Sequence, residues 1–211
     1  MFAIRRRGLI LGASALALGV SLGACNSGGA SGGVTADDMV MGNASAPVTL
    51  VEYASTTCPH CAEFHEAAWE QLKTTYIDTG RVRFVFREFP TPPPAIAVAG
   101  FQLARCGGAT PEQYFTRVGE LFRQQRAIFA SGTMEGVRAK LIEIGGAAGL
   151  SEPQVLECIS DEAGAERIRR IVDSAEADNV TGTPTFIING TKFEQAPTYE
   201  NLSRVLEAAG A

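Results

Sequence analysis

Residues 48–61 read VTLVEYASTTCPHC and join an apolar segment directly to a Cys-Pro-His-Cys motif. Residues 48–54 are almost continuously apolar, which is typical of a strand that is buried on both faces. Apolar residues then recur on one face at helical spacing, and they predict a helix over 59–79. Residues 82–88 (VRFVFRE) predict a second strand. This βαβ order is long enough for a right-handed crossover between two parallel strands.

The rest of the chain divides into a helical region and a short strand region. Four prolines within residues 90–94 interrupt regular structure, and helical signals follow them. Capping boxes that begin at Thr110 and Ser151 mark two of the helix starts. Residues 185–193 contain an Asn-Gly turn and predict a β-hairpin, after which a capped helix closes the chain. The element order is therefore βαβ, a helical insertion over about 90–180, and ββα.

The N-terminal segment predicts export from the cytoplasm. Arg5–Arg7 precede an apolar stretch over residues 8–24, which is too short to predict a transmembrane anchor. Leu22-Gly23-Ala24-Cys25 is similar to a bacterial lipobox, in which the cysteine becomes the lipidated first residue. We expect a signal peptide over 1–24, a lipidated Cys25, a Ser/Gly-rich tether over 25–38 and a folded domain over 39–211. An ordinary signal peptide with a nearby cysteine, and a twin-arginine export signal, are the alternatives.

The charge of the mature chain argues against one class of function. The formal charge of −5 becomes −8 when the three N-terminal arginines are removed with the signal. An acidic protein without a basic cluster is not typical of nucleic-acid binding, and we expect no nucleic-acid partner.

Cys58 stands where the first strand ends and the helix begins. Backbone N–H groups of a first helical turn have no partner within the helix, and the helix dipole adds partial positive charge there. Both effects favour the thiolate, so the pKa of Cys58 should fall from ~8.5 into the range of about 3.5–7.5. Pro59 suits the first helical position, and His60 can add a donor or a positive charge beside the sulfur. Cys61 is within reach for a disulfide and begins the buried stripe of the helix.

The cysteine count suggests two pairs. Four cysteines remain when Cys25 is set aside, an even number for an oxidising compartment. A zinc half-site at Cys58 and Cys61 is the alternative to a redox disulfide, but Cys106 and Cys158 lie 52 positions apart and do not form a second close ligand pair. We expect Cys106 and Cys158 to form a structural disulfide, with two buried reduced thiols as the alternative.

The Cys-Pro-His-Cys motif after an apolar strand, together with Gly182-Thr183-Pro184-Thr185-Phe186 before the hairpin, resembles the DsbA-like family of thiol:disulfide oxidoreductases. The resemblance spans roughly residues 40–211. It implies an α/β, thioredoxin-like fold with an inserted helical domain of about 90 residues. It also implies that Cys58 reacts with substrate and that Cys61 resolves the intermediate. The Pro184 peptide bond should be cis, so that Thr183 faces the sulfurs and binds the substrate backbone.

Two further residues near the motif allow two interpretations each. Glu52 lies within the first strand, where a buried carboxylate could exchange a proton with Cys61, and the resemblance places an acidic residue there. The alternative is a glutamate that reaches water at the strand end. His65 shares the helix stripe with Phe64 and Trp69, and we expect it to be a packing histidine rather than a ligand.

These observations predict a thiol:disulfide oxidoreductase of the bacterial cell envelope, or periplasm, that oxidises dithiols in exported proteins. The resemblance implies a quinone-linked membrane oxidase as the partner that restores the disulfide. We expect a monomer, held at the membrane only by lipid on Cys25, with no cofactor and no resident metal. A disulfide isomerase or reductase is the first alternative. An envelope lipoprotein that binds Cu(I) through Cys58, His60, Cys61 and His65 is the second.

Overall fold

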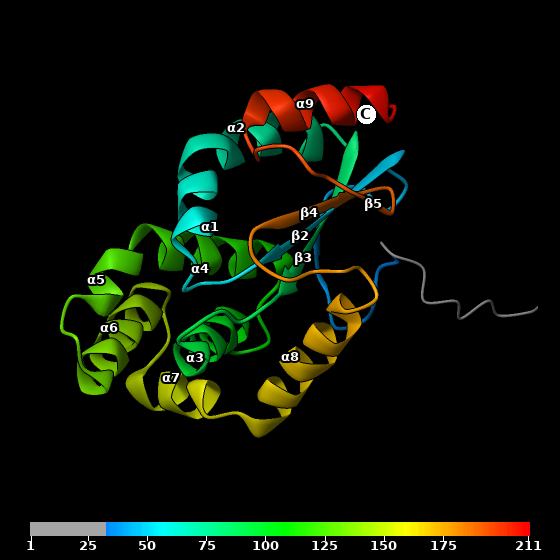
Figure 1. Ribbon diagram of the computed structural model, residues 1–211. Coiled ribbons are helices and arrows are strands. Elements are labelled where there is room, and N and C mark those ends of the chain that lie inside the picture. Colours follow the sequence, from blue (N-terminus) through cyan, green and yellow to red (C-terminus); the bar gives the residue numbers. More distant parts are fainter. Residues whose placement is uncertain (1–32) are drawn as a thin grey trace, which may run out of the picture.

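Figure 1 shows the computed structural model, which describes residues 33–211. The predicted signal peptide, the lipidation site Cys25 and most of the predicted tether lie outside the described residues. Within 33–211, no helix combines the length and apolar character that crossing a membrane would require.

A five-stranded sheet forms the centre of the fold, in the order β1-β3-β2-β4-β5. The strands are β1 (Met39–Met41), β2 (Val48–Ala54), β3 (Val82–Glu88), β4 (Thr185–Ile188) and β5 (Thr191–Lys192). β2 and β3 are parallel and pair along their whole length, from Val48 opposite Val82 to Ala54 opposite Glu88. The other pairs are antiparallel. The predicted βαβ unit and the closing hairpin are both present in this sheet.

β2 is almost continuously apolar because it contributes to two cores. Leu50 faces the larger core, which contains the helix after β2 and the C-terminal helix α9 (Tyr199–Ala208). Val51 and Tyr53 face a smaller core on the other side of the sheet, which is closed by the end of α8 (Glu162–Ala175). A strand between two cores has no water-facing side, which explains the absence of polar alternation.

The helix after β2 runs from Pro59 to Ile77 without a break. It consists of α1 (Pro59–Phe64), η1 (His65–Trp69), α2 (Glu70–Leu72) and η2 (Lys73–Ile77), in which the two η segments are π-helical. Its buried face includes Cys61 and Phe64, as the apolar stripe predicts. The wider π-helical turns have no signal in the sequence.

Six helices follow β3, namely α3 (Pro94–Arg105), α4 (Pro111–Arg123), α5 (Gln125–Phe129), α6 (Met134–Ala147), α7 (Glu152–Ile159) and α8. Figure 1 shows α3 to α7 gathered beside the sheet, while α9 lies on the opposite side of the molecule. Both predicted capping boxes are formed, at Thr110 and at Ser151. Cys106 and Cys158 are bonded to each other, with their Cα atoms 5.5 Å apart.

The packed body begins before Met39. Asp38, which the sequence analysis assigned to the tether, is buried, and its carboxylate accepts a hydrogen bond from Arg87 Nε at 3.1 Å. Val34 packs against the smaller core. The last residues of the segment predicted as tether therefore belong to the packed structure.

Candidate active site

Cys58 is the N-cap residue of α1. Three residues separate it from the end of β2, and its backbone N–H donates to Ser55 O at 3.1 Å. Pro59 occupies the first helical turn, where its missing N–H leaves no helical hydrogen bond unmade. Cys58 is 7% exposed, and its Sγ lies 3.2 Å from Thr183 O. The strand therefore delivers the sulfur to the N-terminus of the helix, opposite the loop that precedes β4.

Neighbouring donors lower the pKa of Cys58 from 9.0 to about 5. The largest contribution is the hydrogen bond from the Cys61 thiol, followed among the favourable ones by the Thr183 hydroxyl and by the backbone N–H groups of Cys61 and His60. Burial of the sulfur opposes these effects. Thr183 Oγ1 is buried and has no other hydrogen-bond partner within residues 33–211, so it is free to donate to a thiolate. The first-turn donors that the sequence indicates are part of this arrangement.

Cys61 has the opposite environment. It is 0% exposed, and burial is the main reason why its pKa is raised well above 9.0. The hydrogen bond between Cys61 and Cys58 and the negative charge of Glu52 raise the pKa of Cys61 further. The two sulfurs, both free thiols in the structure, therefore differ strongly in acidity. Cys58 is the sulfur that can remain a thiolate at neutral pH, and Cys61 is the one that needs a proton.

His60 points away from the core. Its side chain is 79% exposed, and its Nδ1 lies 2.9 Å from Glu63 Oε2. That hydrogen bond is the main cause of the raised pKa of His60, with smaller contributions from the charges of Glu63 and Cys58. The group of His60 that donates to the Cys58 sulfur is its backbone N–H, while its ring acts at most through its charge.

Glu52 and His65 form a buried pair that the sequence analysis did not foresee. Glu52 is 0% exposed, and its two carboxylate oxygens lie 3.1 and 3.0 Å from His65 Nε2. The interpretation of Glu52 as a strand-end residue that reaches water is therefore wrong. His65 does pack as expected, with ring centroids 4.5 Å from Phe122 and 5.1 Å from Trp69, but it also holds the carboxylate.

Gln125 was also missed by the sequence analysis. It is the first residue of α5, it is buried, and its Nε2 donates to Thr56 O at 2.9 Å and to Cys58 O at 3.0 Å. A lone glutamine at a helix start carries no sequence signal of such a role. This side chain connects the helical insertion to the loop that carries the reactive sulfur.

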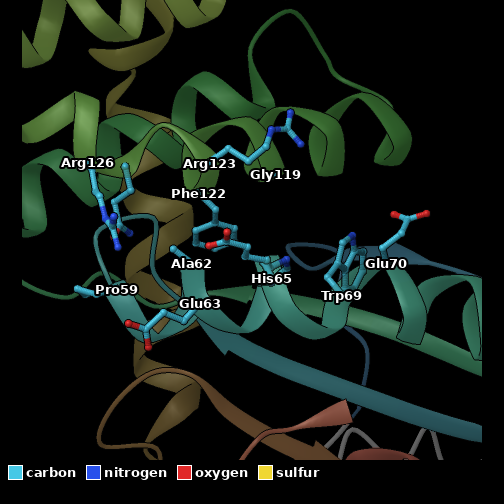
Figure 2. Close-up of a pocket in the computed structure, with 12 residues that line it drawn as sticks. Pro59, Ala62, Glu63, His65, Trp69, Glu70, Gly119, Phe122, Arg123 and Arg126 are labelled. Carbon is cyan, nitrogen blue, oxygen red and sulfur yellow. The ribbon is translucent and has the colours of Figure 1, made fainter.

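Two surface grooves flank the site. The first is lined by His60, Phe64, Thr183, Pro184 and Tyr199 among others, and it extends from His60 and Thr183, beside the redox pair, to the start of α9. The Thr183–Pro184 peptide bond on its wall is cis. Figure 2 shows the second groove, which lies between the α1–η1 segment and the helices α4 and α5.

The candidate metal ligands have other partners. His60 is hydrogen-bonded to Glu63 and His65 to Glu52. Within residues 33–211, no group of three or more His, Cys, Asp or Glu side chains is arranged to hold a metal ion. The described geometry therefore gives no support to a copper site at the motif.

A family model described as thioredoxin matches residues 34–208. Proteins named as protein-disulfide oxidoreductases in Rickettsia prowazekii and Rickettsia typhi are each 34% identical to this chain over 174 residues, which is 82% of this chain. Those residues cover 61% and 62% of the two rickettsial proteins, so the chain spans about three fifths of their length.

Solved structures with the same fold include alpha-DsbA1 of Wolbachia pipientis, with 25% sequence identity and a TM-score of 0.72. That match covers 83% of this chain and 92% of the Wolbachia chain. Oxidised BdbD of Bacillus subtilis, 20% identical, also has a TM-score of 0.72, over 85% of this chain and 96% of its own. At that identity the likeness concerns the fold alone.

Proposed function

This chain belongs to the thioredoxin family, with the helical insertion of its DsbA-like members, and we propose that it oxidises thiols of exported proteins. The observation that carries the proposal is the asymmetry of the two sulfurs. The pKa of Cys58 is about 5, whereas that of Cys61 is raised well above 9.0. A thiolate that is stable at neutral pH is a good leaving group, and it favours the reduced form of the pair.

The reaction begins with the Cys58–Cys61 disulfide. A client thiolate attacks Cys58 Sγ and forms a mixed disulfide, while the bond between Cys58 and Cys61 breaks. The electron pair stays on Cys61 Sγ, which takes up a proton. A second client thiolate then attacks the client sulfur of the mixed disulfide and releases Cys58 as a thiolate. Two electrons have passed from the client to the cysteine pair, and the client carries a new disulfide.

The first groove is the proposed client site. Thr183 and Pro184 form its wall beside Cys58, and an extended client segment could pair with the Thr183 backbone next to the mixed disulfide. Thr183 O, now 3.2 Å from Cys58 Sγ, would be the acceptor for a client N–H. Phe64 and Tyr199 supply apolar contact further along the groove.

The N-terminal residues and the chemistry of the cysteine pair support a proposal for the cellular setting. We propose a protein of the cell envelope, monomeric and attached by lipid on Cys25. A membrane oxidase linked to quinone would return the cysteine pair to the disulfide. Mass spectrometry of the mature protein tests the anchor: a diacylated N-terminal Cys25 is expected, and an unmodified cysteine or another start would contradict it.

The activity is tested with a reduced, unfolded client whose native state needs disulfides. The oxidised protein should restore client activity in stoichiometric amounts. Its Cys61→Ser variant, first converted to the Cys58–glutathione disulfide, should exchange glutathione for the client and accumulate a mixed disulfide with the client through Cys58. Cys58→Ser is the matched control and should trap little. If the oxidised protein leaves the client reduced, or if a glutathione titration shows a strongly reducing pair, the proposed oxidase function is wrong and a reductase is favoured.

A further inference from the structure

Glu52 is enclosed in the protein, close to the thiol that must gain and lose a proton. Its side chain has no exposed surface, and its charge is one of the causes of the raised pKa of Cys61. Among residues 33–211, the one hydrogen-bond partner of its carboxylate oxygens is His65 Nε2. Within the described residues, His65 is therefore the hydrogen-bonded neighbour with which Glu52 can exchange a proton.

His65 connects this buried carboxylate with solvent. Its side chain is only 6% exposed, yet the residue lines the second groove, a cavity of about 660 Å³ that opens to the surface. Figure 2 shows His65 between the helix that carries it and Phe122 of α4. The same imidazole ring thus contacts the carboxylate in the core and belongs to a residue that lines an open groove.

The helix places His65 and Cys61 on the same side. They are four residues apart, so both point toward β2, from which Glu52 extends. His65 is also the first residue of the π-helical segment η1, and π-helical turns within α-helices are frequent at functional sites. The alignment of Cys61, Glu52 and His65 is therefore built into one strand and one helix.

A proton exchange between Glu52 and Cys61 is one of the two roles that the sequence allows for Glu52. We propose that His65 supplies this exchange by carrying protons between the water of the second groove and Glu52. This proposal rests on the oxidoreductase function proposed above. When a client thiolate breaks the Cys58–Cys61 bond, Cys61 leaves with the electron pair. Glu52 delivers a proton to that sulfur, His65 replaces the proton on Glu52, and groove water replaces it on His65. Reoxidation runs the same transfers in reverse.

Charged groups surround His65 on two sides of the groove. Its own helix contributes Glu63, Glu66 and Glu70 to the lining of that groove. Arg123 of α4 and Arg126 of α5 line it from the other side. β3 contacts His65 through the Phe86 ring, and α4 through the Phe122 ring. The buried carboxylate of Glu88 lies two residues after Phe86 and is paired with Arg105. Of the charged groups that the structure describes near His65, Glu52 is the one within hydrogen-bond distance of its ring.

The test is the single-turnover reduction of the Cys58–Cys61 disulfide by dithiothreitol, followed by acid quench and alkylation. His65→Gln keeps a side-chain N–H for Glu52 but cannot carry a proton. We expect it to slow the reaction at least about tenfold near pH 6, because general acid catalysis usually contributes more than that. The deficit should shrink at alkaline pH, where protons become scarce for the wild-type protein as well.

Chemical rescue separates proton transfer from packing. His65→Ala leaves a gap beside the groove, so added imidazole should restore much of the rate, while a bulky buffer of similar strength should not. Imidazole should not restore the rate of Glu52→Gln, since the glutamine amide cannot pass a proton to Cys61. Phe122→Leu is the matched control: it removes a ring that packs on His65 and should lower stability without changing the pH profile. Urea unfolding of each variant shows whether it is folded.

A folded His65→Gln variant with the wild-type pH profile would overturn the proposal, and so would a folded His65→Ala variant that imidazole cannot rescue. Both readouts follow the cysteine pair itself and need no protein client. A wild-type protein that reacts with dithiothreitol but fails to oxidise clients would contradict the proposed function and leave the assignment of His65 intact.

Discussion

The molecule contains two cysteine pairs in contrasting positions. Cys58 caps the N-terminus of α1, and its partner Cys61 lies in the first turn of the same helix. Cys106 caps the C-terminus of α3, and its partner Cys158 lies in the last turn of α7. The first pair is reduced in the structure and the second is bonded.

Helix position explains why only one pair is suited to exchange. The N-terminus of a helix offers unpaired N–H groups and partial positive charge, which stabilise a thiolate, whereas the C-terminus presents carbonyl oxygens and partial negative charge. A thiolate at Cys106 or Cys158 would face the unfavourable end of its helix. The second pair also closes a loop of 52 residues, so its bond constrains the unfolded chain far more than the short Cys58–Cys61 ring.

The largest expected difference between the pairs concerns activity. Cys58→Ser should abolish client oxidation, because it removes the sulfur that accepts the client. Replacing both Cys106 and Cys158 by serine should leave the rate within about threefold of wild type, since neither sulfur enters the proposed exchange. Client refolding by the two variants measures this. A loss of oxidase activity in the folded double serine variant would show that the second pair takes part in the chemistry.

The free energy of unfolding should depend on the second pair and hardly on the first, which is the reverse of the order expected for activity. The double serine variant at Cys106 and Cys158 should lose about 2–4 kcal/mol of unfolding free energy, as expected for a bond that closes a long loop. Reducing Cys58–Cys61 in the wild type should cause no comparable loss. Urea unfolding of the two forms compares them, and an unchanged midpoint in the double variant would contradict the structural role of the second pair.

The sequence predicts the framework of the first pair well, because each of its parts has a local signal. The apolar run of β2, the proline after Cys58 and the Thr183-Pro184 segment are readable without coordinates. β1 was missed, since three residues are too few to show a period. The Glu52–His65 pair was missed because its contact depends on how the helix crosses the strand.

The contacts of Gln125 also depend on tertiary packing and could not be predicted from the sequence. They supply a test with a smaller expected effect. Its amide holds the carbonyls of Thr56 and Cys58, although it lies more than sixty residues further along the chain. Gln125→Leu leaves both buried carbonyls without this donor, which should cost about 1–3 kcal/mol of unfolding free energy. We also expect the Cys58 pKa to change, because the loop that positions the sulfur is released. Gln124→Leu, at the neighbouring helix cap, is the matched control for apolar substitution. Equal effects of the two substitutions would exclude a specific role for Gln125.

Of the residues near Cys58, we expect the His60 side chain to have the smallest effect on the Cys58 pKa. Its ring is exposed and engaged by Glu63, so His60→Ala should raise the Cys58 pKa only slightly. His60→Pro also removes the backbone N–H that donates to the sulfur, and it should raise the pKa more and make the pair more reducing, by about 30 mV for each pKa unit. Thiolate absorbance and a glutathione equilibrium measure both variants. If His60→Ala has the larger effect, the ring and not the backbone is the important donor.

The most direct test of the contrast between the pairs is the alkylation rate of each cysteine in the reduced wild-type protein as a function of pH, resolved by peptide mass spectrometry after mild reduction. Because the Cys58 pKa is lowered from 9.0 to about 5, its thiolate persists across neutral pH and is lost only as the pH falls through about 5. Cys58 should therefore be alkylated with a midpoint near pH 5, Cys61 should remain unmodified until strongly alkaline pH, and Cys106 should stay linked to Cys158. A Cys58 midpoint near 9, or alkylation of Cys61 before Cys58, would contradict the account.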